Sequence, residues 1–419
     1  MLFTGQKIFN IKTIYYLFFN LINNFFYKKF VDYCIYQKIL LNLFLIILHT
    51  LIISGCSRIH HNNINDDFSL KRVTFNDLNR WNKSNTHYQS LQVFTLSCKP
   101  IKARDPSLNF SKKIKKFGKN YQWQKLCDVA EDYINKIEKI KKYNKLNQNQ
   151  RYKLNKIAKE FWEKNFTPYF ITHKNKKRGI ITGYFSIELK GSRSMKSPFI
   201  YPIYKVPDNN KIKISRKDIE NGAIKGSEII YVDDIARKYF LHVQGSGKIV
   251  LNEDNSNTII LSYHKRNGFP YRCINEKIIK YYPKTKIGNT SEIIKWLNEH
   301  KNIAQEIINH DPSYIFFKEQ KYNGFIGAQG IPLTTEQSAA VDNTIYSYGT
   351  PIWVDTIMNH KHSVHKVNSK YSRLLIAQDR GGAINGSNRI DLFFGSGKNA
   401  ERRASSMREY ADFYILLPH

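Results

Sequence analysis

Acidic side chains are scarce in this sequence. Its 419 residues hold 34 Asp and Glu against 66 Lys and Arg, so the formal net charge is +32. Such a charge usually favours an anionic partner, for example nucleic acid, an anionic membrane or an acidic glycan. The lysines are spread along nearly the whole chain, however, and no spacing typical of an RNA-binding motif or a zinc finger occurs. The excess charge therefore indicates a composition bias of the whole surface, and nucleic-acid binding is not expected.

A long apolar run occurs once, near the N-terminus, over Ile39–Gly55. It is marginal for a membrane span of about 20 residues but suits the central region of a signal peptide. The run ends in Ile53-Ser54-Gly55-Cys56, which looks like a lipobox. This pattern predicts that Cys56 is lipidated and becomes the mature N-terminus. The alternative is an uncleaved anchor helix with an incidental cysteine.

Cysteine is rare, and no CxxC pair or other metal-like spacing occurs among the five. If Cys34 is removed with the signal and Cys56 carries lipid, then Cys98, Cys127 and Cys273 remain. A disulfide suits an oxidising compartment, but the sequence leaves its pairing open. No structural metal is expected.

Helical spacing of apolar residues appears in two segments, Asn120–Lys142 and Arg151–Asn165. Both predict amphipathic helices whose lysines lie on a solvated face. A third helix is expected over Ser291–His300, capped by Thr290 or Ser291.

Near the C-terminus, two short apolar runs, Leu374–Ala377 and Ile390–Phe394, flank a glycine-rich turn. Both are typical of strands. Asp379 follows the first run, and Asp391 lies inside the second. Apolar neighbours would raise the pKa of the Asp391 carboxyl and keep it protonated near neutrality, as a general acid requires. The alternative is that these aspartates only cap a turn or carry surface charge.

Residues 373–418 resemble the C-terminal three-aspartate module of the membrane-bound lytic murein transglycosylase A family, with its AxDxGGAIxG and DLFxGxGxxA patterns. The matches include both aspartates and Gly381, Gly382 and Gly386. The third aspartate of the module would be Asp342, in Ala340-Val341-Asp342. Arg380 departs from the threonine common at its place in the family.

A second resemblance to this family lies at residues 179–193, where the sequence predicts short strands with glycine turns. The family motif TGYYEPxLxGS is matched in part, and Tyr184 takes the place of its first tyrosine. Phe185 replaces the second tyrosine, and Ser186-Ile187 replaces Glu-Pro. The alternative is that this segment is merely an edge strand of a barrel.

Residues 239–249 resemble the FxHxQGSGR segment of the family. Gln244 and Ser246 can hydrogen-bond sugar hydroxyls and N-acetyl groups, and the glycines beside them would let backbone approach a bulky ligand. Lys248 stands where relatives often carry arginine, and could meet a carboxylate. Aromatic residues around Tyr263 and Tyr271 suit stacking on sugar rings, although aromatics at strand spacing are more often core residues.

The motifs divide the chain, which shows no internal repeat and has room for two domains. We expect a signal peptide with an unusually long N-terminal extension over 1–55, a lipidated tether over 56–70, the N-terminal part of the first domain over 71–178, an inserted substrate-binding β domain over 179–317 and the catalytic remainder of the first domain over 318–419.

The resemblance implies a mainly β protein with N-terminal helices: a double-psi β-barrel, a smaller inserted β-barrel-like domain and a groove between them. It implies a lytic transglycosylase that cleaves the glycan strands of peptidoglycan without water and leaves 1,6-anhydromuramic ends. Asp391 would be the acid and base, and Asp379, Asp342, Gln244, Ser246, Tyr184 and Lys248 would contact substrate. No cofactor is expected.

The resemblance also implies a location on the periplasmic face of the outer membrane, through a lipid on Cys56, and contact with cell-wall synthesis or hydrolysis complexes. The main alternative is an inactive glycan-binding or scaffolding lipoprotein on the same fold, which the changes at Ser186, Ile187 and Arg380 would favour. A hydrolase that uses water is a further alternative.

Overall fold

The computed structural model describes residues 68–141, 147–173, 178–254, 257–285, 287–320, 324–358 and 369–419. The chain divides into two compact units, Met1–Arg58 and Ile59–His419, and the first lies outside the described residues. The apolar run Ile39–Gly55 and Cys56 therefore lie outside them as well, and their roles stay predictions. Within the described ranges, no helix is long and apolar enough to cross a membrane.

Helices dominate the N-terminal part of the described chain, as expected. The elements before the main sheet are β1 Phe68–Arg72, η1 Phe75–Asp77, η2 Trp81–Lys83, α2 His87–Lys102, η3 Lys115–Phe117, α3 Asn120–Lys141, α4 Gln148–Asn165 and β2 Phe166–His173. The two predicted helices are confirmed as α3 and α4. Helix α4 begins at a capping box in which Asn147 and Gln150 satisfy each other's backbone N–H groups. A disulfide between Cys98 and Cys127 joins α2 to α3.

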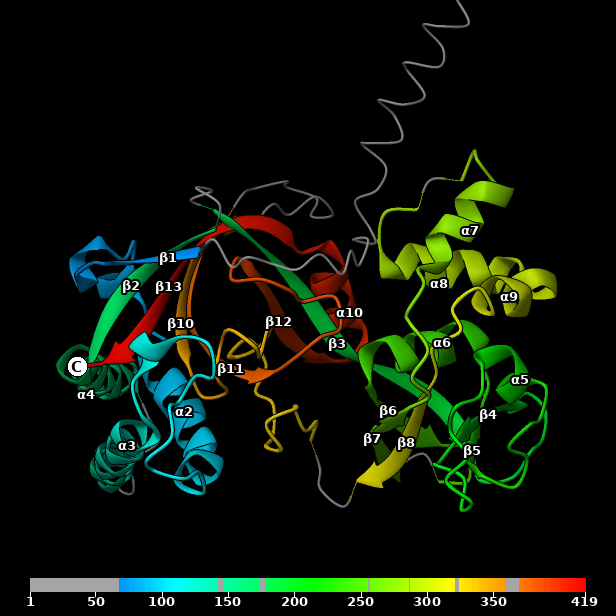
Figure 1. Ribbon diagram of the computed structural model, residues 1–419, viewed down its shortest axis with the longest axis horizontal. Coiled ribbons are helices and arrows are strands. Elements are labelled where there is room, and N and C mark those ends of the chain that lie inside the picture. Colours follow the sequence, from blue (N-terminus) through cyan, green and yellow to red (C-terminus); the bar gives the residue numbers. More distant parts are fainter. Residues whose placement is uncertain are drawn as a thin grey trace, which may run out of the picture. The chain divides into compact units, whose positions relative to one another are not determined.

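Six strands close into a ring beside these helices (Figure 1). They are β3 Gly179–Ser192, β9 Ser338–Val341, β10 Pro351–Met358, β11 Ser369–Asp379, β12 Arg389–Ser396 and β13 Arg408–Pro418. Around the ring the order is β13, β10, β11, β9, β12 and β3, and β3 pairs again with β13. The pairs β9–β11 and β3–β12 are parallel, and the other ring pairs are antiparallel. This ring fits the expected barrel, although its double-psi crossing stays a prediction.

Strand β3 continues from the ring into a second sheet. The order there is β4 Tyr201–Tyr204, β5 Glu228–Val232, β3, β6 Ser246–Leu251, β7 Thr258–Arg266 and β8 Ile315–Gln320. The helices that accompany this sheet are α5 Arg216–Glu220, α6 Ile235–Gln244, α7 Ile274–Tyr281, α8 Thr290–Glu299 and α9 Lys301–Ile308. The last helix of the chain, α10 Gly397–Ser406, packs on β3 and β12. The sequence therefore underestimates the helices of the insert.

Two local predictions are wrong. Residues 179–192 form one strand of 14 residues rather than short strands with turns. Its glycines serve close packing instead, because a Cβ on Gly183 would lie 2.6 Å from the Phe394 ring and one on Gly191 would lie 2.5 Å from Ile249. Helix α8 begins at Thr290, and its cap is Asn289, whose side chain accepts a hydrogen bond from the Glu292 N–H.

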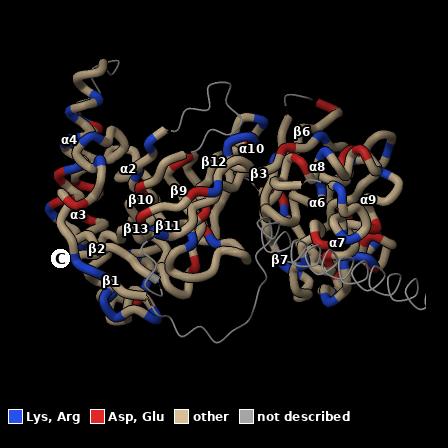
Figure 2. Tube along the Cα trace, turned by 90° about the horizontal axis from the view of Figure 1, so that it is seen from above, with Lys and Arg blue, Asp and Glu red and all other residues tan. Residues whose placement is uncertain are grey.

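Lys and Arg are scattered along the described chain rather than gathered in one segment (Figure 2). This distribution agrees with the composition bias inferred from the sequence. Local arrangements of charge, and not the total, therefore bear on function.

Candidate active site

Asp391 lies in β12 between two ring strands. Its backbone neighbours are Thr182 of β3 and Ala340 of β9. Along β12, Ile390 and Leu392 are buried while Asp391 is half-buried, so its carboxyl belongs to the open face of the strand. The Thr182 hydroxyl donates a hydrogen bond of 2.6 Å to Asp391 Oδ1.

Burial raises the pKa of the Asp391 carboxyl above its usual value. The Arg389 guanidinium and the hydrogen bond from Thr182 oppose this rise, whereas the Asp379 carboxylate adds to it. A protonated carboxyl on the open face of a strand can donate its proton to a ligand.

Asp379 lies at the end of β11, where it also neighbours Ala340. The two aspartates thus flank one residue of β9, and two strand spacings place their Cα atoms about 10 Å apart. Asp379 accepts hydrogen bonds from the Tyr184 hydroxyl at 2.8 Å and from the backbone N–H groups of Ala328 and Arg380 at 2.9 Å each. Burial raises the pKa of Asp379, and these hydrogen bonds oppose the rise.

Tyr184 interacts with both aspartates. Its hydroxyl is bound to Asp379, and its ring lies 5.2 Å from the ring of Phe393. Burial raises the pKa of Tyr184, and both aspartates raise it further, so this hydroxyl remains a hydrogen-bond donor.

Asp342 follows β9 and holds the glycine-rich turn rather than joining the pair. Its carboxylate accepts hydrogen bonds from the Gly386 N–H at 2.8 Å and from the N–H and hydroxyl of Thr344 at 3.0 and 2.7 Å. The turn leads from Asp379 into β12, so Asp342 fixes the connection between the strands that carry the other two aspartates.

The predicted residues of the insert lie where β3 leaves the ring. The hydroxyls of Ser246 and Ser186 are 3.0 Å apart, and Lys248 Nζ lies 3.9 Å from a Glu188 carboxylate oxygen. Gln244 is the last residue of α6. The expectation that the neighbouring glycines admit a ligand stays a prediction, and a Cβ on Gly247 would lie 2.5 Å from Leu241, so this glycine also allows close packing within the chain.

Two residues of the site, Thr182 and Arg389, were not predicted from the sequence. Arg389 Nη1 donates a hydrogen bond of 2.8 Å to the Thr182 hydroxyl, which in turn donates to Asp391. Each lies two residues before a predicted site residue on its strand, Tyr184 and Asp391. Strand alternation places such residues on one face, and this signal could have identified them.

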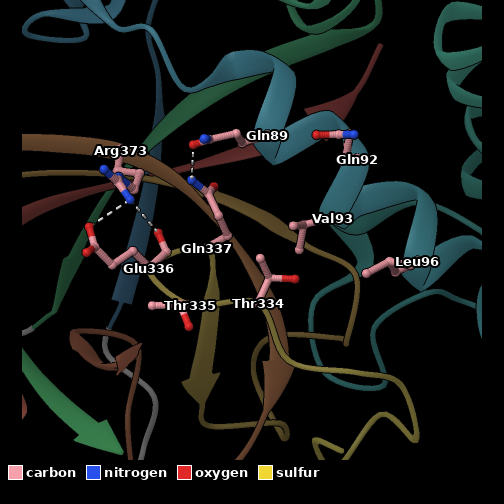
Figure 3. A pocket seen from close by; sticks show the side chains of 9 residues that line it. All are labelled: Gln89, Gln92, Val93, Leu96, Thr334, Thr335, Glu336, Gln337 and Arg373. Carbon is pink, nitrogen blue, oxygen red and sulfur yellow. Dashed lines mark hydrogen bonds and ion pairs between the residues drawn. The ribbon is translucent and has the colours of Figure 1, made fainter. Parts of the chain in front are cut away.

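A cavity of about 520 Å³ lies between α2 and residues 334–337. Its lining side chains include Glu336, which pairs with Arg373 at 2.8 Å, and Gln337, whose amide donates to Gln89 (Figure 3). None of the predicted site residues lines it. We place the candidate site at the aspartates, because they occupy the open face of a sheet, where a long ligand needs no enclosed cavity. Among the described residues, no cluster of three or more His, Cys, Asp or Glu could hold a metal.

The closed ring, its aspartates and the sheet that continues from β3 define a β-rich protein of the three-aspartate class. Residues 180–318 match the family described as "MltA specific insert domain", and residues 337–417 match "3D domain". The chain belongs to the membrane-bound lytic murein transglycosylase A family.

A relative described as a membrane-bound lytic murein transglycosylase A homolog, from Buchnera aphidicola subsp. Schizaphis graminum, is 32% identical over 249 residues. The alignment covers 56% of this chain and 65% of the relative, so the chain spans just under two thirds of that protein's length.

Solved structures share the fold. The membrane-bound lytic murein transglycosylase of Agrobacterium tumefaciens superposes with a TM-score of 0.67 at 24% identity, over 84% of this chain and 98% of the other. An Escherichia coli MltA structure with bound chitohexaose has a TM-score of 0.60 at 21% identity, over 85% and 96% of the two chains.

Proposed function

We propose that this protein is a peptidoglycan lytic transglycosylase. It cleaves the β-1,4 bond between N-acetylmuramic acid and N-acetylglucosamine and leaves a 1,6-anhydromuramic end. The observation that carries this proposal is the Asp391 carboxyl, which is desolvated, raised in pKa and placed on the open face of β12. Membership of the family supports the same reaction.

Asp391 performs both proton transfers in this proposal. Its carboxyl first gives a proton to the glycosidic oxygen, and the bond from that oxygen to C1 of the muramic ring breaks. The resulting carboxylate then takes the proton of the muramic C6 hydroxyl while that oxygen bonds to C1. No water enters, and the carboxyl regains its proton. Because Thr182 donates to Oδ1, the proton resides on Oδ2.

Asp379, Tyr184 and Asp342 have supporting roles in this proposal. The negative charge of Asp379 helps to keep Asp391 protonated, and Tyr184 holds Asp379 in place. Asp342 fixes the turn that precedes β12. All three lie at ring strands or their ends, which gives the acid a rigid support.

The Thr182 hydroxyl should set the pH range of activity. Thr182→Val removes a hydrogen bond that favours the ionised carboxylate, so the pKa of Asp391 rises further. The general acid then stays protonated to higher pH, and the alkaline limb of kcat/KM moves upward. We also expect kcat/KM at its optimum to fall by about tenfold, because the carboxyl is less well oriented.

Thr182→Ser is the matched control, because it keeps the hydroxyl and should retain the wild-type pH profile. The groups that face Asp391 are Arg389 on its own strand, Tyr184 on β3, Asp379 on β11 and Arg408 on β13, and all remain in both variants. Identical pH profiles of kcat/KM for the valine and serine variants would show that the Thr182 hydroxyl does not set the pKa of Asp391.

We assign substrate contacts to Gln244, Ser246 and Lys248 in the insert, which we place at residues 179–317. The relative with bound chitohexaose supports a glycan ligand for this fold.

Replacing Gln244 and Ser246 together by alanine should weaken glycan binding by about 1 kcal/mol for each lost hydrogen bond. The melting temperature should change little, because both side chains are half-buried. A loss of stability with unchanged affinity of the folded fraction would show that they only close a turn.

We also propose that residues 1–55 form a signal peptide with a long extension and that residues 56–70 form a lipidated tether. The tether would lead to residues 71–178 and 318–419 as one domain. This organisation would put the protein on the periplasmic face of the outer membrane, near other cell-wall enzymes.

Cys56→Ala should abolish palmitate labelling and leave the signal uncleaved. Normal labelling and processing would contradict the lipobox.

An inactive scaffolding lipoprotein is the second candidate, which the changed residues Ser186, Ile187 and Arg380 favour. The structure accommodates two of these changes. Ser186 is hydrogen-bonded to Ser246, and Arg380 holds Asp379 through its backbone N–H, which any residue except proline provides. Incubation with purified sacculi separates the candidates. A transglycosylase releases soluble muropeptides, whereas a scaffold binds the sacculi and releases none.

A further inference from the structure

The open face around Asp391 extends across β3 to β13. Thr182 has Asp391 as its backbone neighbour on one side and Arg408 on the other. Two residues further along each strand, Ile180 lies beside Tyr410. Directly paired residues of neighbouring strands point to the same side of a sheet. Arg408 and Tyr410 therefore share the face that presents the proposed acid.

The burial of β13 confirms this orientation. Arg408 and Tyr410 are exposed, whereas Glu409 and Ala411 between and after them are buried. Asp412, the next residue on this face, is half-buried and paired with Arg178. Within the described part of the chain, the Arg408 guanidinium has no ion-pair or hydrogen-bond partner.

Two guanidiniums thus lie near the acid. Arg389 is half-buried and bound to Thr182; burial lowers the pKa of Arg389, and the positive charge of Arg408 adds to this effect while Asp391 opposes it. Their mutual repulsion costs free energy that a bound anion would remove. The Cα of Arg408 is about 10 Å from that of Asp391, which is two strand spacings. A carboxylate on a ligand that also reaches Asp391 fits this place.

The Tyr410 ring adds an apolar surface beside this cation. Tyr410 is 66% exposed, an unusual state for a large aromatic residue within a ring strand. Exposed tyrosine presents a flat face that stacks on sugar rings and a hydroxyl that can hydrogen-bond them. A cation and an aromatic face therefore lie side by side on the strand face that carries the acid.

We propose that Arg408 and Tyr410 form a subsite for a carboxylate-bearing sugar near the bond that Asp391 cleaves. Arg408 binds the lactyl carboxylate of a muramic residue that carries no stem peptide, and Tyr410 stacks on its ring. This inference rests on the proposed function and names the part of the substrate that the barrel itself recognises. Such a subsite would let the barrel distinguish muramic acid from N-acetylglucosamine, which lacks the carboxylate.

The test compares two tetrasaccharides of equal length by calorimetric titration. One alternates N-acetylglucosamine with N-acetylmuramic acid carrying free lactyl carboxylates, and the other is chitotetraose, which has none. Both are titrated into the Asp391→Asn protein, so the ligand stays intact. Arg408→Gln should weaken binding of the muramic ligand about tenfold, as expected for loss of a charged hydrogen bond, and change chitotetraose less than twofold. Tyr410→Ala should weaken both ligands severalfold.

Matched controls lie elsewhere on the surface. Arg402 is an exposed arginine of α10 bonded only to Asn399 within the described chain, and Tyr152 of α4 is 73% exposed. Arg402→Gln and Tyr152→Ala should change neither affinity. The subsite would be overturned if Arg408→Gln weakened binding of both ligands equally or of neither. It would also be overturned if Arg402→Gln weakened binding of the muramic ligand as much as Arg408→Gln does. Binding here needs no turnover, so this result is independent of whether wild-type protein releases muropeptides.

Discussion

Replacing Asp391 by asparagine should lower turnover of peptidoglycan by roughly 10² to 10⁴-fold. Asparagine keeps the size of the side chain and can still accept the hydrogen bond from Thr182, but it cannot exchange a proton. Binding of chitohexaose should therefore persist while kcat collapses. The measurement is release of soluble muropeptides from sacculi, together with titration of the glycan.

Two other aspartates provide controls. Asp379→Asn should cost less than Asp391→Asn, because Asp379 holds the site but does not titrate in the reaction. Asp412→Asn should leave activity near normal, although burial raises the pKa of Asp412 too, because Asp412 is paired with Arg178. Near-normal turnover of Asp391→Asn would show that another group transfers the proton.

Replacing Arg216 by methionine should destabilise the insert by about 3–5 kcal/mol, which is the usual cost of removing one partner of a buried ion pair. The side chain is 1% exposed and lies 3.6 Å from the Asp311 carboxylate, which is also buried. Its Nε and Nη2 donate to the backbone carbonyls of Asp311 and Ser313 at 2.9 and 2.5 Å. Methionine would leave Asp311 without its cation, and burial already raises the pKa of Asp311.

Urea unfolding followed by tryptophan fluorescence measures this loss. Arg193→Met is the matched control, because Arg193 pairs with Glu319 on the surface of the same sheet, and such pairs contribute about 1 kcal/mol or less. Equal effects of the two substitutions would contradict the structural importance of the buried pair.

Local patterns predicted the strands that carry the aspartates well. The apolar runs at Leu374–Ala377 and Ile390–Phe394 lie in β11 and β12, and helical spacing identified α3 and α4. The two helices follow a clear period because one face is buried, whereas the two strand segments are recognised as short, continuous apolar runs that are almost wholly buried.

Tertiary contacts explain what the sequence did not predict. Gly183 and Gly191 looked like turn residues, yet they allow Phe394 and Ile249 to approach a continuous strand. Helix α2 was not predicted, and it carries Pro100, a residue that disfavours helix interiors, in its last turn. Strand alternation could have indicated Arg389 and Thr182 separately, but their mutual contact joins residues more than 200 positions apart and follows only from the fold.

The mass of the products from wild-type protein tests the central claim most directly. Sacculi digested with the purified chain should yield muropeptides that end in 1,6-anhydromuramic acid, each lighter by one water than a hydrolysis product. This result follows if Asp391 both donates the first proton and removes the proton of the C6 hydroxyl. Soluble products with reducing muramic ends would show instead that water is the nucleophile, and would contradict the account.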